Sequence, residues 1–113
     1  MNFEPKISII IVNYNGQDFL TDCLDSVLKS DYPDFEVILV DNNSSDDFIN
    51  IVKNKFSQVK IIINKKNLGF ARANNIGIKH ASGNAIFLLN NDTVIDPRLI
   101  KKLTRENFSL VQR

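Results

Sequence analysis

The sequence predicts an α/β fold in which helices cover both faces of a parallel sheet. Four short runs rich in Ile, Val and Leu alternate with three amphipathic segments, which gives the order βαβαβαβ. The runs are continuously apolar, as strands buried on both faces require, and do not alternate with polar residues. No repeat, low-complexity stretch or linker divides the 113 residues. We therefore expect one domain, or part of one, with a real hydrophobic core.

Local signals place each element along the chain. The apolar runs put strands at residues 7–12, 35–40, 59–63 and 85–89. A first helix near Phe19 to Lys29 must stop before Pro33, because proline disfavours helical geometry in the residue ahead of it. A second helix is expected to open at Ser44, which begins an S-x-x-D capping pattern.

The last two helices are set by glycine and proline. The third is expected at about Gly69 to Ala81 and should end by Gly83. A fourth should begin at Asp96-Pro97, with Asp96 as the cap and Pro97 in the first helical position.

Polar residues follow three of the predicted strands. They are Asn13 to Gly16, Asp41, and Asn90 to Asp92. The carboxyl ends of parallel strands lie along one edge of a sheet, where open α/β sheets bind ligands. If the chain reverses after its third strand, the fourth strand lies beside the first, and a crevice opens between their ends. That strand order is an assumption at this point.

Composition narrows the classes of partner. Fourteen basic and thirteen acidic residues give a formal net charge of +1, which indicates neither a polyanion-binding nor a membrane-adsorbing surface, so nucleic acid is not an expected partner. No apolar run reaches the roughly 20 residues of a membrane span, and the first residues lack the features of a signal peptide. We expect the cytoplasm, or the inner face of its membrane, as the location. The single cysteine, Cys23, lies among apolar residues at helical spacing and is interpreted as a core thiol.

Asp92 is the best candidate for a metal ligand. Mg²⁺ and Mn²⁺ sites on phosphorylated substrates often use one or two carboxylates, with phosphates and water completing the shell. The alternative is an Asx-type turn through Asp92 and Thr93, which local sequence favours. Asp41 could accept hydrogen bonds from a base or ribose, or it could simply begin a polar turn. Tyr14 could stack on a base or pack its own loop against the sheet.

The segment around Gly69 offers a site for a diphosphate. Backbone amides at the start of the third helix, together with Arg72, suit a phosphorylated ligand. The alternative is a solvent-facing Arg72 on a helix that needs Gly69 for its entry turn.

Four segments in this order and spacing resemble the family 2 glycosyltransferases, and most closely their rhamnosyltransferase-like branch. The segments are Ser8 to Asn15, Val40 to Asp46, Asn67 to Asn74 and Leu88 to Thr93. The resemblance implies the nucleotide-sugar-binding part of a GT-A fold with strand order 3-2-1-4, covering residues 1–113. It implies that Asp41 contacts the nucleobase and that the loop from Asn13 to Asn15 walls the nucleotide pocket, with Asn43, Asn90 and Asn91 around it. Asp92 would be the retained acid of the family's D-x-D metal motif, whose first position is Asn90 here.

The resemblance also implies an activity that this stretch of chain does not complete. We expect a UDP- or dTDP-sugar as donor, a divalent cation, inversion at the anomeric carbon, and a glycan or lipid-linked acceptor. The catalytic base and the acceptor-binding half would lie beyond Arg113, so the chain alone should be inactive.

Two other functions are compatible with the pattern. One is a nucleotide-sugar-binding module completed by a partner chain. The other is a phospho-receiver domain, which would need clustered acids after the first strand, where Asn13-Tyr14-Asn15 has none. The strand from Ala85 to Leu89 is expected at an edge of the sheet and is a candidate for self-association.

Overall fold

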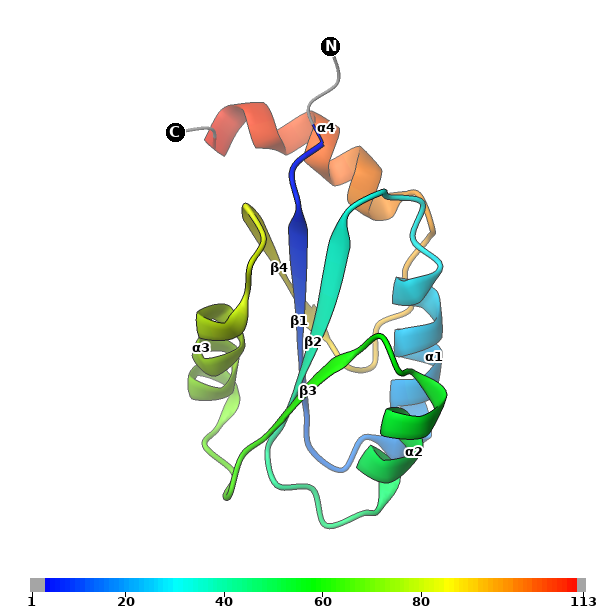
Figure 1. Cartoon of the computed structure of the whole chain (residues 1–113), viewed down its shortest axis with the longest axis vertical. Coiled ribbons are helices and arrows are strands. Elements are labelled where there is room, and N and C mark those ends of the chain that lie inside the picture. The colour runs from blue at the N-terminus through cyan, green and yellow to red at the C-terminus, as the bar shows by residue number, and fades with distance from the viewer. Residues whose placement is uncertain (1–3, 112–113) are drawn as a thin grey trace.

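The computed structural model describes the backbone of residues 4–111 and the side chains of residues 4–105. The strands are β1 (Ile7–Asn13), β2 (Phe35–Asp41), β3 (Lys60–Ile63) and β4 (Ala85–Asn90), and the helices are α1 (Gln17–Leu28), α2 (Phe48–Lys55), α3 (Phe70–His80) and α4 (Leu99–Val111). All strand pairs are parallel, and the strand order is β3-β2-β1-β4. The predicted fold class and the reversal after the third strand are confirmed (Figure 1).

Helices cover the two faces of the sheet unequally. α1 and α2 lie on one face, which we call the helix-pair face, and α3 lies on the other, the α3 face (Figure 1). Alternate strand residues point to opposite faces. The odd-numbered residues of β1 and β2, such as Ile9 and Leu39, belong to the larger core cluster on the helix-pair face. The even-numbered Ile10 and Val40 belong to the smaller cluster under α3.

α3 approaches the sheet closely because of a glycine. A Cβ atom on Gly77 would lie 2.5 Å from Cγ2 of Ile10, so only glycine fits there without displacement.

Cys23 is fully buried in the larger cluster, as the sequence predicted. Burial raises the pKa of its thiol to about 11, so the group stays protonated near neutral pH and is no nucleophile.

β4 forms one edge of the sheet and is covered on one side. Phe87 and Leu89 pack against the larger core cluster, over which α4 also lies. Ile86 and Leu88 point to the α3 face, where they are 39% and 52% exposed. The described residues therefore leave part of the apolar surface of β4 uncovered.

Two predicted helix starts are wrong. α2 begins at Phe48 after Asp47, because the Ser44 hydroxyl donates to Asp41 and is drawn into a tertiary contact instead of capping a helix. α4 begins at Leu99. The Asp96 carboxylate accepts from the Arg98 backbone in a turn that precedes the helix, so Asp96 does not cap the helix and Pro97 lies outside it. Among the described residues, no helix has the length and apolarity needed to cross a bilayer.

Candidate functional site

A cleft of about 460 Å³ opens at the edge of the sheet where the strands end. In Figure 1 this edge lies away from α4, at the other end of the molecule. Strand ends and the start of α3 supply its lining: Val12, Tyr14, Asn42, Asn67, Gly69, Phe70, Asn90, Asn91 and Asp92. Because β1 is flanked by β2 and β4, the ends of all three strands meet here, as the polar strand ends predicted. We call this the rim cleft.

Asp41 lies beneath the rim cleft and does not line it. Its Oδ1 accepts hydrogen bonds from Nδ2 of Asn13 at 3.0 Å and from Oγ of Ser44 at 2.7 Å. Its Oδ2 accepts from the backbone N–H of Ser44 at 2.9 Å. Asp41 is 2% exposed and Asn13 is fully buried. Most of the hydrogen-bonding capacity of this carboxylate is therefore used within the protein, and little of its surface is open to a ligand.

The period of the strands explains this placement. Asn13 and Asp41 are paired in register at odd-numbered positions, and they follow Ile11 and Leu39 on the helix-pair face. The rim cleft lies toward the α3 face, which even-numbered positions approach. Asn42 is the residue after β2 on that side.

The sequence reasoning missed four residues of the cleft lining, namely Val12, Asn42, Asn67 and Phe70. Of these, Asn42 is buried. It is 3% exposed, and it joins β2 to β3 and to the start of α3. Its Oδ1 accepts from Nδ2 of Asn64 at 2.9 Å and from the backbone N–H of Leu68 at 3.3 Å, and its Nδ2 donates to the Gly69 carbonyl at 3.1 Å. The two backbone partners fix which end of the amide is oxygen. The sequence signal that could have indicated Asn42 is the two-residue period of the strand, which places it on the same side of the sheet as Val40.

The loops after β1 and β2 are tied together beside the cleft. Asn15 has a φ of 51°, and its Oδ1 accepts from the backbone N–H of Ser45 at 2.8 Å. Its own N–H donates to Oγ of Ser44 at 2.9 Å. Asn43 is exposed and has a φ of 66°, a left-handed conformation that asparagine tolerates better than most residues. Both asparagines shape the rim without lining the cleft.

The end of β4 is open by comparison. Asn91 donates from Nδ2 to Oδ1 of Asn13 at 3.0 Å, which links the ends of β4 and β1. Asn90 and Asp92 are exposed. The turn after β4 is closed by the Thr93 N–H donating to the Asn90 carbonyl at 3.1 Å, so the Asx-type turn expected through Asp92 is not what holds it. Within residues 4–105, the Asp92 carboxylate accepts no hydrogen bond and forms no ion pair.

The residues around Asp92 fit one kind of metal site. Among the described residues, no group of three or more His, Cys, Asp or Glu side chains could hold a metal ion. Asp92 is the only acid that lines the rim cleft, and its neighbours Asn90 and Asn91 carry amides. A single carboxylate is enough for Mg²⁺ or Mn²⁺ when a bound diphosphate supplies further oxygens, and it is too little for a metal bound by protein alone.

The start of α3 contributes less to the cleft than the sequence suggested. Gly69 lines the cleft with a φ of 83°, but its N–H already donates to Oδ1 of Asn67 at 2.9 Å. Arg72 is exposed and is not part of the cleft lining. His80 lies at the far end of α3, with Nδ1 2.9 Å from the Ile76 carbonyl. Tyr14, by contrast, is half exposed and lines the cleft.

Comparison with known proteins agrees with this arrangement. Residues 8–109 match the family described as Glycosyl transferase family 2. An uncharacterised glycosyltransferase of Haemophilus influenzae is 38% identical over 110 residues, covering 94% of this chain and 43% of that protein. The poly(ribitol-phosphate) beta-glucosyltransferase of Bacillus spizizenii is 38% identical over 110 residues, covering 92% of this chain and 17% of that protein.

A solved structure shares the fold. The crystal structure of S. aureus TarS 1-349 in complex with UDP-GlcNAc superposes with a TM-score of 0.82 at 28% identity, covering 91% of this chain and 32% of that chain. The curated relatives are all longer, and this chain spans 16–43% of the length of the first eight.

Proposed function

The chain belongs to glycosyl transferase family 2, and from that premise we propose that it binds the nucleotide-diphosphate sugar donor of a glycosyltransferase in the rim cleft. The observation that carries the proposal is that the two sides of the rim cleft present different chemical groups to a ligand. Tyr14 and Asn42 lie on the β1–β2 side, and Asp92 is the acid on the β4 side, beside Asn90 and Asn91. An aromatic ring and an amide suit a nucleoside, and a lone exposed carboxylate suits a metal-bound diphosphate.

The nucleoside side of the proposal rests on preformed groups. The Tyr14 ring, half exposed, would stack on the base. Asn42 has one amide hydrogen without a partner among the described residues and would donate it to the ligand. Asp41, which the sequence reasoning placed against the base, would support this side from below by holding Asn13 and Ser44. Asn15 and Asn43 would shape the loop around it.

The diphosphate side of the proposal rests on Asp92. With a divalent cation held by Asp92, the ion would supply charge stabilisation to the departing diphosphate. Asn90 and Asn91 would donate amide hydrogens nearby, and Gly69 would let the backbone approach the ligand. Arg72 would reach the diphosphate only by swinging from its exposed position, so we assign it the smallest share of binding.

The reaction that we propose for the whole protein is transfer of the sugar, with inversion, to a hydroxyl of a glycan or lipid-linked acceptor. Asp92, the acid in the lining of the rim cleft, is assigned to the diphosphate. A catalytic base beyond Arg113 stays a prediction. The resemblance to the rhamnosyltransferase-like branch stays a prediction for the sugar, and the proposed location is the cytoplasm, at the inner face of its membrane.

Calorimetric titration tests the proposal. We expect the chain to bind UDP or dTDP more tightly than ADP, and more tightly with Mn²⁺ present than without it. Asp92→Ala should lose the Mn²⁺ effect and keep the preference among bases. A chain that binds none of these nucleotides at millimolar concentration would contradict the assignment of the rim cleft.

We also propose self-association through the free edge of β4. In the described sheet β4 pairs only with β1, and Ile86 and Leu88 are exposed beside its unpaired backbone, the arrangement that favours pairing with a second strand. Light scattering over a concentration series should show dimers that Leu88→Lys abolishes. Ile51→Lys on α2 is the matched control, because Ile51 is 51% exposed but lies away from this edge. A wild-type chain that stays monomeric at high micromolar concentration would refute the contact.

A further inference from the structure

A row of basic side chains lies on α4 and on the turn that precedes it, at the other end of the molecule from the rim cleft. It consists of Arg98, Lys101, Lys102 and Arg105, and we call it the basic stripe. Lys101, Lys102 and Arg105 lie on the outward side of α4, and Arg98 lies in the turn that precedes it. On the opposite side Ile100 and Thr104 are buried against the sheet. The three basic residues of α4 span about 6 Å along the helix at a rise of 1.5 Å per residue.

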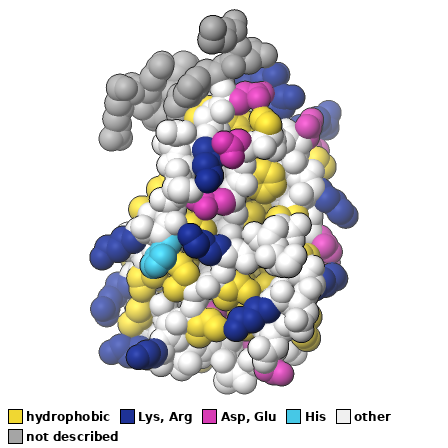
Figure 2. All heavy atoms as spheres, in the orientation of Figure 1, with side chains coloured by type: hydrophobic (Ala, Val, Ile, Leu, Met, Phe, Trp, Pro, Cys, Tyr) yellow, Lys and Arg dark blue, Asp and Glu magenta, His cyan; other side chains and the backbone are white. Residues whose placement is uncertain are grey.

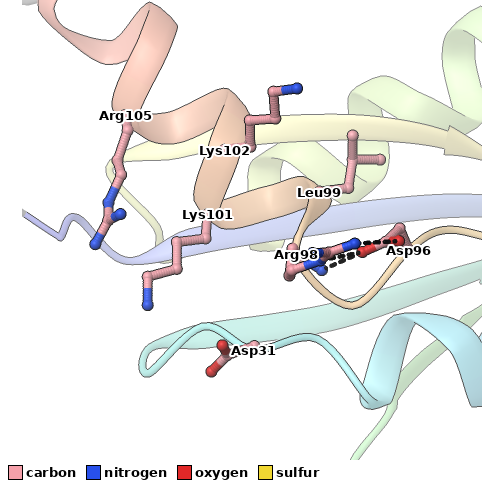
Figure 3. A pocket seen from close by; sticks show the side chains of 7 residues that line it. All are labelled: Asp31, Asp96, Arg98, Leu99, Lys101, Lys102 and Arg105. Atoms are coloured by element: carbon pink, nitrogen blue, oxygen red, sulfur yellow. Dashed lines mark hydrogen bonds and ion pairs between the residues drawn. The ribbon is translucent and has the colours of Figure 1, made fainter.

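The basic stripe borders a hollow of about 710 Å³. Asp31, Asp96 and Leu99 complete its lining. Figure 3 shows Lys101 and Arg105 extending from α4 toward the side on which Asp31 lies, while Lys102 extends from the other side of the helix. The basic groups are thus spread along α4 and do not converge on one point. Such a spread suits several phosphates on a surface better than one compact anion.

Four basic and two acidic side chains line the hollow. Arg98 pairs with Asp96, with Nε of Arg98 3.2 Å from Oδ1 of Asp96. The other three basic side chains form no ion pair with any acid whose side chain the structure describes. Asp31 is the remaining acid of the hollow. Figure 2 shows basic side chains beside acidic ones at the end of the molecule that carries α4.

We propose that the basic stripe docks the chain on an anionic phospholipid surface. The only apolar side chain in the hollow is Leu99, so attraction there is electrostatic and suits headgroup phosphates better than an apolar protein partner. A basic, amphipathic helix is a common form of such a contact. The rim cleft lies at the opposite end of the strands and stays open to a soluble nucleotide (Figure 1). This extends the proposed location, and it differs from the expectation from net charge, which averages local charge over the whole chain.

The test is co-sedimentation with vesicles, without nucleotide, so that failure of the rim-cleft proposal does not affect it. Wild-type chain is mixed with vesicles of equal parts phosphatidylglycerol and phosphatidylcholine, and with vesicles of phosphatidylcholine alone. The variant carries Lys101→Gln, Lys102→Gln and Arg105→Gln. The control carries Lys53→Gln, Lys60→Gln and Lys79→Gln, three exposed lysines on separate elements. Both lose three positive charges, and circular dichroism verifies that both are folded.

We expect wild type to bind only the anionic vesicles, with affinity that falls as salt rises. Each basic residue near such a surface contributes about fivefold in partitioning, so the stripe variant should bind about a hundredfold more weakly, while the control changes far less. Equal losses in the two variants would show a net-charge effect and overturn the proposal. Binding to soluble inorganic polyphosphate without binding to vesicles would overturn it in favour of a soluble polyanion.

Discussion

The two sides of the rim cleft are built differently. The β1–β2 corner, which we define as Asn13, Asp41, Asn42 and Ser44, is held by buried side-chain hydrogen bonds, and its first three members are at most 3% exposed. The β4 corner is defined as Asn90, Asn91 and Asp92, and among the described residues its side chains form a single hydrogen bond, from Asn91 to Asn13. One corner is preformed, and in the other Asn90 and Asp92 are exposed and their side chains form no hydrogen bond with the described residues.

The difference indicates which part of a ligand each corner can select. A buried network fixes its donors before a ligand arrives, so it can discriminate between bases at small entropic cost. An exposed carboxylate without hydrogen-bond partners gains its geometry from what it binds, as metal sites completed by phosphates do. We therefore assign specificity to the β1–β2 corner and metal dependence to the β4 corner.

The largest expected effect comes from opening the preformed corner. Asp41→Ala removes the acceptor for Asn13 and for both donors of Ser44, which leaves buried polar groups unpaired. We expect a loss of about 2–4 kcal/mol in the free energy of unfolding, together with weaker nucleotide binding. Urea denaturation measures the first and calorimetry the second. Asp92→Ala is the matched control at the other corner, and equal destabilisation by the two variants would remove the contrast between the corners.

A smaller effect is expected where the two corners meet. A Cβ atom on Gly16 would lie 2.3 Å from Oδ1 of Asn13 and 2.6 Å from Nδ2 of Asn91, the two atoms of the bond that joins the corners. Gly16→Ala should therefore cost about 1–3 kcal/mol of unfolding free energy and weaken nucleotide binding. Asn91→Ala deletes the same bond without a clash and should cost less. If Gly16→Ala matches wild type in both measurements, the corners are not coupled through this contact.

A pH-dependent effect on stability is expected at the amino end of β2, away from the rim cleft. Burial raises the pKa of the Glu36 carboxyl, but hydrogen bonds from Ser8 and Ser82 outweigh burial and hold that pKa below its ordinary 4.5. The stabilisation is complete above pH 4.5 and is lost as pH falls through the lower pKa of the folded state. Urea midpoints measured over the acid range should show this loss in wild type and less of it in Glu36→Gln. The control is Asp18→Asn, an exposed acid on α1. If the urea midpoint of the Glu36 variant falls with pH as steeply as that of wild type, Glu36 is excluded as the source of the loss of stability in acid.

The smallest effect on stability is expected at Asp92. Asp92→Asn should change the free energy of unfolding by less than about 0.5 kcal/mol, because the exposed carboxylate has no partner among the described residues. The same variant should lose most of the Mn²⁺ dependence of UDP binding. A variant that keeps the full Mn²⁺ response would move the metal site away from Asp92.

Sequence alone predicted the fold because its signals are local. Continuous apolar runs and the polar residues that follow them predicted the strands, the parallel sheet and the ligand-binding edge. The strand order followed from crossover handedness plus an assumed reversal, which the pairing of β4 with β1 confirms. The helix starts at Ser44 and Asp96 were wrong because tertiary contacts and a turn took up the capping groups.

The details of the site depended on contacts between distant residues. Nothing local to Asn42 shows that Leu68 and Gly69 will meet its amide. That Asn42 lines the rim cleft and Asp41 does not could have been predicted from the period of the strand, since Asn42 lies on the side of Val40 and Asp41 on the side of Leu39. The sequence reasoning missed the basic stripe because a net charge of +1 averages over all 113 residues.

One calorimetric comparison tests the central claim that the two corners bind different parts of one ligand. The chain is titrated with uridine and with UDP, each with and without Mn²⁺. We predict that uridine binds with the same affinity in both conditions, that UDP binds more tightly when Mn²⁺ is present, and that Asp92→Ala removes only this gain. An equal gain from Mn²⁺ for uridine and UDP, or binding of UDP with no detectable binding of uridine at millimolar concentration, would contradict the account.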